Sequence, residues 1–172
     1  MKNKTPPLDK EITFTEEQIL VSKTNTKGII TYCNPDFIEI SGYKKSELIG
    51  QQHNIVRHPD MPRVIFKLLW ETLQANREFN GYIKNLAKDG SYYWVFANVT
   101  PSFSMDNELL GYYSVRRKPD SEKLNYIKNL YFELFEIEQQ SQSKDAIDAS
   151  RYKLNTVLNG REMGYDEFIL SI

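Results

Sequence analysis

The fold is decided by the stretch from Phe79 to Arg116, FNGYIKNLAKDGSYYWVFANVTPSFSMDNELLGYYSVR. Its aromatic and β-branched residues favour strands. Turn-forming residues interrupt it twice, at positions 88–91 (KDGS) and at Asp106-Asn107. The pattern predicts three consecutive strands over residues 79–87, 92–100 and 109–116, with Pro101 ending or bending the second.

The preceding residues predict two more strands and several helices. A short strand begins at residues 19–21, a turn follows at 25–28 (NTKG), and a second strand covers 28–33. Two short helical pieces follow over 35–50. A longer helix is predicted over 62–76, with Pro62 at its first position and Asp60 as its cap. This order of elements is typical of an α+β fold, in which helices cover one face of a single sheet.

The last third of the chain is predicted to be helical. Apolar residues recur at helical spacing over residues 121–139, and a second helical run ends near Gly160, before a short tail at 165–170. One face of the first helix carries Leu124, Ile127, Tyr131, Leu134 and Phe135. This face could pack on the chain's own sheet or on a second polypeptide, and we expect the second. Truncation after Lys118 is then expected to leave the first domain intact.

Composition limits both the architecture and the partners. A chain of 172 residues suits one domain with an extension. We divide it into a flexible arm (1–15), a main domain (16–118) and a helical extension (119–172). A net charge of −1 gives no reason to expect nucleic acid. Without a signal-like segment or an apolar run of about 18 residues, we expect a cytoplasmic protein that does not insert directly into the membrane.

Several kinds of catalytic or metal chemistry find no support in the sequence. It contains neither a dinucleotide fingerprint nor a phosphate-binding P-loop. His53, His58 and Asp60 match no familiar metal-site spacing. The single cysteine, Cys33, lies in a β-rich segment and is expected to be a buried, unreactive thiol. We therefore expect neither a metal site nor an enzyme.

The polar loop at residues 53–62 (HNIVRHPDMP) is the most informative segment. Arg57 offers a planar fork for phosphate oxygens, and His58 adds a hydrogen bond or a stacking face. A helix starting at Pro62 would direct free N–H groups toward the same place, which favours an anion. The residues alone also allow a plainer reading, in which Asp60 only caps the helix and Arg57 is its surface partner.

The chain resembles a known family in several places. Residues 28–37 (GIITYCNPDF), 41–43 (SGY) and 47–50 (ELIG) look like the opening of a PAS domain. The loop at 53–62 is similar to the signature of FAD-binding PAS domains of the bacterial aerotaxis-receptor (Aer) type. The resemblance continues to about Lys118 and covers roughly 100 residues. It implies a PAS fold, a five-stranded antiparallel sheet whose concave face and helices enclose FAD, here followed by the C-terminal helical extension.

The resemblance also implies cofactor-binding residues. Arg57, His58 and Asp60 would lie around the pyrophosphate and the ribose–adenine side of FAD, and Asn34 at the mouth of the pocket. Further residues would surround the flavin ring: Phe66 and Trp70 as an aromatic wall, Asn85 on its polar edge, and Ser114 near it on the last strand. Strand alternation independently puts Phe79, Gly81, Ile83 and Asn85 on one face and turns Tyr93 inward on the next strand. The family commonly has tryptophan where this chain has Phe79, which keeps an aromatic wall but lacks the indole N–H.

The function implied is a flavin-based redox sensor in aerotaxis or energy taxis. Its partner would be a separate membrane-bound chemoreceptor or its cytoplasmic signalling region, as for soluble CetB-like proteins, or a second copy of the chain as a homodimer. The receptor would recruit it to the inner face of the membrane. The main alternative is a cofactor-free PAS interaction module. Haem binding would need a histidine on the long helix, and residues 62–76 contain none. Photochemistry of the light-oxygen-voltage type would need a cysteine in the helical region beside the flavin, but the single cysteine lies on an early strand. A flavoenzyme would need a second site beside the ring, and none is evident.

Overall fold

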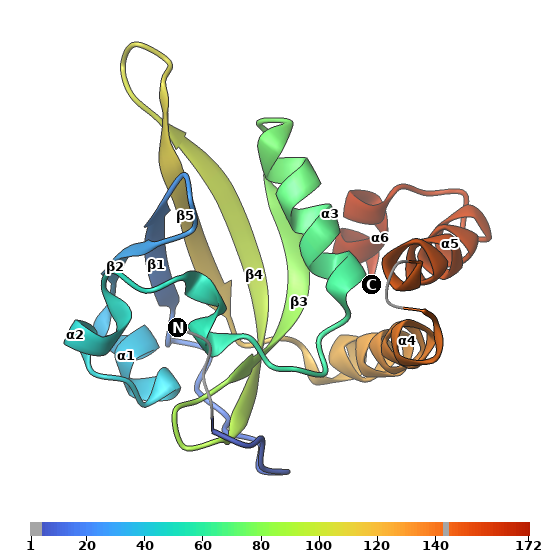
Figure 1. Ribbon diagram of the computed structural model, residues 1–172, viewed down its shortest axis with the longest axis horizontal. Coiled ribbons are helices and arrows are strands. Elements are labelled where there is room, and N and C mark those ends of the chain that lie inside the picture. Colours follow the sequence, from blue (N-terminus) through green and yellow to red (C-terminus); the bar gives the residue numbers. More distant parts are fainter. Residues whose placement is uncertain (1–4, 143–144) are drawn as a thin grey trace.

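A five-stranded antiparallel sheet forms the centre of the computed structural model, which describes residues 5–142 and 145–172 (Figure 1). The order of its strands is β2-β1-β5-β4-β3. The strands are β1 (Leu20–Asn25), β2 (Ile30–Cys33), β3 (Phe79–Leu86), β4 (Tyr92–Phe103) and β5 (Leu109–Arg117). The predicted three-strand meander is therefore present, and the PAS-type sheet is confirmed.

Helices connect the two halves of the sheet and follow its last strand. Between β2 and β3 lie α1 (Pro35–Ser41), α2 (Lys45–Leu48), the short 3₁₀ helix η1 (His53–Val56) and α3 (Arg63–Gln74). After β5 come α4 (Ser121–Gln140), α5 (Ala146–Asn159) and α6 (Tyr165–Ser171). Figure 1 shows α3 in front of β3 and β4, with the last three helices beyond the β3 edge.

Two local expectations were wrong in detail. β4 continues through Pro101, which lies opposite Tyr112 of β5, and ends only at Phe103. The N-cap position of α3 is Pro62, not Asp60, and no side chain of this local segment caps the helix. The carboxylate that accepts from the first N–H groups of α3 comes instead from α4, as described below.

The N-terminal segment is not a free arm over its described part. The N–H of Leu8 donates to the carbonyl of Gly90 at 2.8 Å, and the N–H of Ile12 donates to that of Tyr92 at 2.7 Å. Phe14 is buried in the core. Residues 5–15 therefore lie against the β3–β4 hairpin and belong to the folded domain, while residues 1–4 of the predicted arm lie outside the described residues.

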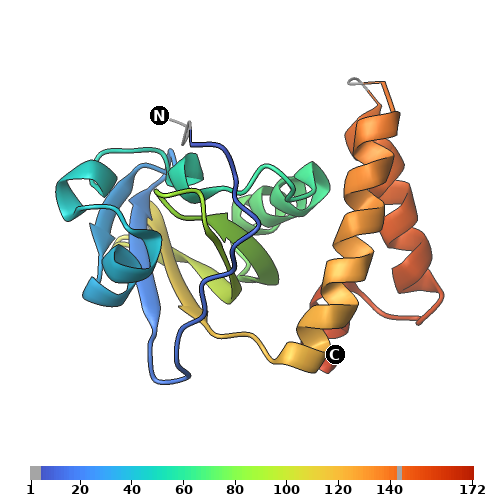
Figure 2. The ribbon, with the colours of Figure 1, turned by 90° about the horizontal axis from the view of Figure 1, so that it is seen from below.

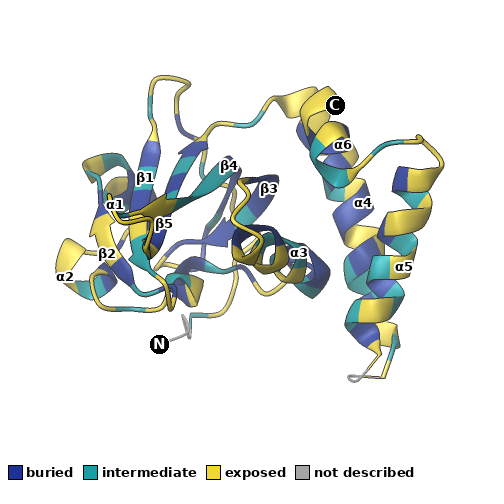
Figure 3. Cartoon of the chain, turned by 90° about the horizontal axis from the view of Figure 1, so that it is seen from above, coloured by how far each residue is buried: buried dark blue, intermediate teal, exposed yellow. Residues whose placement is uncertain are grey.

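The C-terminal helices also belong to the same packed body, which corrects the expectation that α4 meets a second polypeptide. Ile127 and Leu134 of α4 are fully buried within the chain, and Tyr131 contacts Trp94 of β4, with the ring centres 6.2 Å apart. Figure 2 shows α4 and α5 standing beside the sheet, and Figure 3 shows the buried positions along α4. The apolar face of α4 is therefore already covered by the sheet and by the other C-terminal helices.

Candidate cofactor site

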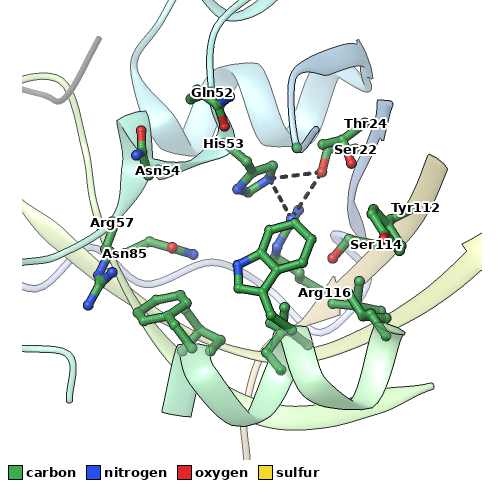
Figure 4. Close-up of a pocket in the computed structure, with 18 residues that line it drawn as sticks. Ser22, Thr24, Gln52, His53, Asn54, Arg57, Asn85, Tyr112, Ser114 and Arg116 are labelled. Atoms are coloured by element: carbon green, nitrogen blue, oxygen red, sulfur yellow. Dashed lines mark hydrogen bonds between the residues drawn. The ribbon is translucent and has the colours of Figure 1, made fainter. Parts of the chain in front are cut away.

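A cavity of about 240 Å³ lies between α3 and the inner face of the sheet (Figure 4). The polar or charged side chains that line it come from β1, β3 and β5, from η1 and the residue before it, and from the loop before α3. The complete lining is Ser22, Thr24, Gly28, Gln52, His53, Asn54, Arg57, Phe66, Leu69, Trp70, Leu73, Ile83, Asn85, Ala97, Val99, Tyr112, Ser114 and Arg116.

Strand register explains which sheet residues reach the cavity. Asn85 lies opposite Tyr93, Val99 lies opposite Ser114, and Ser114 lies opposite Ser22 on the next strand. Directly opposed residues share a face of the sheet, and so do residues two apart along a strand. One continuous face therefore runs from Asn85 on β3 to Ser22 on β1.

Helix α3 supplies the apolar wall of the cavity. The guanidinium of Arg57 lies 4.0 Å from the centre of the Phe66 ring, and the ring of Trp70 meets Tyr112 edge-on at 5.5 Å. Gly28 stands close by with a φ of 75°, and a Cβ there would approach Trp70 to 3.4 Å. A side chain at position 28 would thus be strained and would crowd Trp70.

A buried polar cluster closes the sheet side of the cavity. Nη2 of Arg116 donates to Ser22 Oγ at 3.0 Å and lies 2.7 Å from Nε2 of His53. Burial, and then the charge of Arg116, lower the pKa of His53 to about 3. Burial also lowers the pKa of Arg116, to about 10. At neutral pH His53 is therefore a neutral acceptor, and the cluster carries the single positive charge of Arg116.

Three buried polar atoms of the cavity lining have no partner among the described residues. They are Asn85 Nδ2, Ser114 Oγ and Arg116 Nη1. The first and third can only donate hydrogen bonds, and the hydroxyl of Ser114 can also donate. Leaving a buried donor unpaired costs about 1–3 kcal/mol. The cavity is therefore suited to a ligand that presents hydrogen-bond acceptors toward β3 and β5.

Four of the nine sequence-predicted site residues line this cavity: Arg57, Phe66, Trp70 and Asn85. Asn34 does not. Its side chain accepts from the N–H groups of Phe37 and Val21 and donates to the carbonyl of Ile19. It caps α1 and ties it to β1, so its polar atoms already serve the fold.

Two predicted aromatic residues are fully buried away from the cavity lining. Phe79 stacks on Tyr165 of α6, with the ring centres 5.7 Å apart. Tyr93 has no exposed surface, and burial raises its pKa well above the usual tyrosine value. In this structure, Phe79 therefore packs against α6 and does not form part of the aromatic wall.

His58 and Asp60 face the β3–β4 hairpin and not the cavity. Nδ1 of His58 accepts from the N–H of Asp60 at 3.1 Å, and the imidazole lies edge-on to Tyr92. Burial and the charge of Lys84 lower the pKa of His58 to about 4, although Asp60 opposes this shift. The carboxylate of Asp60 is paired with Lys84 at 3.0 Å.

The N-terminus of α3 is held by Glu138 of α4. The buried carboxylate accepts from the N–H groups of Arg63 at 2.8 Å and Val64 at 2.9 Å, and from the hydroxyl of Ser150 on α5 at 2.9 Å. The helix dipole favours a negative charge at this position. The expectation that these N–H groups are free to bind a ligand anion is therefore wrong, and the helix that walls the cavity is fastened to the extension.

Sequence reasoning missed the buried cluster of His53, Ser22 and Arg116. Alternation along β5 contained a usable signal for one member, because Tyr112, Ser114 and Arg116 are two residues apart and share the inward face. An arginine at an inward strand position is uncommon unless it has a partner or a role. His53 lies in the informative loop, but neither its type nor its spacing indicates that it faces Arg116.

The architecture is an antiparallel sheet with a helix packed over its inner face, enclosing a cavity whose lining carries unpaired buried donors. Residues 30–116 match the sequence profile of the PAS fold, and the chain belongs to the PAS family. It is 39% identical over 116 residues to the aerotaxis receptor of Escherichia coli, a match that covers 67% of this chain and 23% of the receptor. It is 30% identical over 102 residues to the nitrogen fixation regulatory protein of Klebsiella pneumoniae, a match that covers 59% of this chain and 21% of that protein. The chain thus spans less than a quarter of these relatives.

Solved structures agree on the fold. A PAS domain from Colwellia psychrerythraea superposes with a TM-score of 0.54 at 23% identity, covering 59% of this chain and 86% of that domain. A light-oxygen-voltage domain structure, from work on a flavin analogue, superposes with a TM-score of 0.57 at 19% identity. The match covers 64% of this chain and 84% of that one.

Three further findings concern the cysteine, membranes and metals. Cys33 is buried on β2, where desolvation raises its pKa, as expected of an unreactive thiol. Across residues 5–142 and 145–172, no helix is both long and apolar enough to cross a bilayer. Over the same residues, no three His, Cys, Asp or Glu side chains gather as they would around a metal ion.

Proposed function

We propose that this protein is a non-catalytic redox sensor that binds FAD in the cavity between α3 and the sheet. The observation that carries the proposal is the set of unpartnered donors on Asn85, Ser114 and Arg116. The polar edge of a flavin ring offers several acceptors to such donors, while its tricyclic body suits the apolar wall of Phe66 and Trp70. When bound, FAD supplies electron-transfer chemistry that the side chains lack.

The similarity to an aerotaxis receptor and to a nitrogen fixation regulatory protein supports a sensing role. The shared region is the PAS domain, which is the part that would receive the signal. Arg57 lines the cavity on the loop before α3 and has no carboxylate bound to it in the described structure. We assign it to the pyrophosphate of FAD.

The signal would leave the cavity through α3. A change in the charge of the flavin ring would alter which hydrogen bonds Asn85 can make. The strands beside Asn85 and helix α3 would then shift. Because Glu138 joins the start of α3 to α4, and Ser150 of α5 binds the same carboxylate, a shift of α3 would move the extension. The exposed side of α4 and α5, which carries Phe132 and Tyr152, would then present a changed surface to a partner.

The partner we propose is a chemoreceptor's cytoplasmic signalling region, with a second copy of the chain as the other candidate. Exposed aromatic side chains on two neighbouring helices are a reasonable anchor for a receptor helix. Light scattering, which measures molar mass, would distinguish the two. A homodimer doubles the mass of the protein alone, whereas a complex with the receptor fragment increases the mass only when the fragment is added.

A cofactor-free interaction module is the second candidate function. The observation that favours it is that several expected cofactor residues serve the fold: Asn34 caps α1, Phe79 packs on α6, and Asp60 binds Lys84. A cofactor-free module leaves the unpaired donors of the cavity without an explanation, so we prefer the hypothesis that the protein binds FAD.

Arg57→Ala is expected to weaken FAD binding by about 1.5–3 kcal/mol, the range for a hydrogen bond to a charged group. Titration of apoprotein with FAD, followed by flavin fluorescence, measures the dissociation constant. The difference in binding free energy between the variant and wild type should become smaller at high salt, because ions screen the attraction between Arg57 and the pyrophosphate.

Arg77→Ala is the matched control for this titration, because it removes the same charge from an exposed position. Equal dissociation constants for the two variants would refute the assignment of Arg57 to the pyrophosphate.

A further inference from the structure

Arg116 is a buried cation without a counter-anion. It is 5% exposed, and the face of the Phe37 ring lies against it, with the ring centre 5.1 Å from the guanidinium carbon. The polar groups around it are Ser22, neutral His53 and the buried hydroxyl of Tyr93, which is also uncharged at neutral pH because burial raises its pKa. In the described parts of the chain, no carboxylate is paired with it, and its Nη1 has no partner at all. A buried charge in this state costs several kcal/mol unless something else in the site compensates it.

The position of this charge indicates what would compensate it. Arg116 is two residues from Ser114 along β5, so both point into the cavity, and Asn85 lines the same cavity from β3 (Figure 4). The unpaired atoms of all three residues can act as donors. A neutral ligand with acceptors would satisfy their hydrogen bonds, but only a ligand with negative charge would also offset the guanidinium.

We propose that Arg116 is the charge partner of the reduced flavin, so that the cavity binds FAD more tightly after reduction than before it. This rests on the proposed function, since it requires FAD in the cavity. Two electrons from a reductant and one proton from solvent convert the neutral oxidised ring into a reduced ring with one negative charge. No protein group is oxidised in this step. The fixed positive charge favours the product and therefore raises the midpoint potential of bound FAD.

The test compares Arg116→Met with Arg117→Met. Arg117 is exposed, and its guanidinium lies over the ring of Phe96, on the other face of the sheet, so this control loses the same charge outside the cavity. Apoprotein is titrated anaerobically with oxidised FAD and with dithionite-reduced FAD. For Arg116→Met we expect the ratio of the two affinities to fall ten- to hundredfold, which lowers the midpoint potential by about 30–60 mV. Arg117→Met should keep the wild-type ratio.

A third variant, Arg116→Lys, keeps a positive charge and should stay within a few-fold of the wild-type ratio. If Arg116→Met weakens both redox forms equally or abolishes both, the guanidinium serves oxidised and reduced ligand alike, and the proposal is overturned. It is also overturned if the ratio does not change, although FAD binding by wild type would then still support the sensor. Wild-type protein that binds neither form would overturn the sensor itself.

Discussion

A chain ending at Lys118 is expected to lose most of its stability and its FAD. Removing α4 to α6 uncovers Tyr82, Trp94 and Phe96, which are all at least nine-tenths buried in the full chain. Exposing one such side chain to water removes about 1.5–3 kcal/mol of stabilising free energy. Because a whole domain is stable by only about 5–15 kcal/mol, this loss is a large part of the total. It would also leave the start of α3 without the acceptor that Glu138 provides.

Urea unfolding of the full and shortened chains, followed by circular dichroism, measures this effect. We expect a much lower midpoint for the shortened chain and flavin content near zero. A shortened chain with the full-length midpoint and flavin content would show that the extension is a separate unit, as the sequence alone had suggested.

Glu138→Ala is expected to destabilise the protein by about 2–6 kcal/mol. The variant leaves the buried N–H of Val64 and that of Arg63 without an acceptor, at about 1–3 kcal/mol for each group. Because α3 carries Phe66 and Trp70, FAD affinity should fall in parallel. Glu138→Gln keeps one oxygen that can accept a hydrogen bond, so its free energy of unfolding should lie between those of Glu138→Ala and wild type.

Glu136→Ala is the control for this measurement, since position 136 lies about 200° away around the same helix. Its free energy of unfolding should remain within about 0.5 kcal/mol of wild type, as is usual for a substitution away from buried networks. The proposed fastening of α3 is wrong if Glu138→Ala unfolds at the same urea concentration as Glu136→Ala.

The sequence predicted the sheet and its helices well because their signals are local. The turns at 88–91 and 106–107, the helix start at Pro35 and the alternation along β3 each depend on neighbours in the chain. The resemblance also supplied Arg57, Phe66, Trp70 and Asn85, which do line one cavity.

The parts that could not be predicted depend on contacts between distant residues. Glu138 binds the N–H of a residue 75 positions earlier, and α6 covers Phe79 across 86 positions. Helical spacing showed that α4 has an apolar face, but periodicity does not say which surface covers it. Asn34 shows the limit of the resemblance: its type and its place before Pro35 are those of a helix cap, and the structure uses it as one.

One absorbance spectrum of the purified full-length protein, followed by heat release and chromatography of the chromophore, tests the central claim most directly. The FAD-sensor account predicts a yellow protein with one non-covalently bound FAD per chain, which dithionite bleaches and air restores. A colourless protein that cannot be loaded with FAD, or one that releases only FMN, would contradict it.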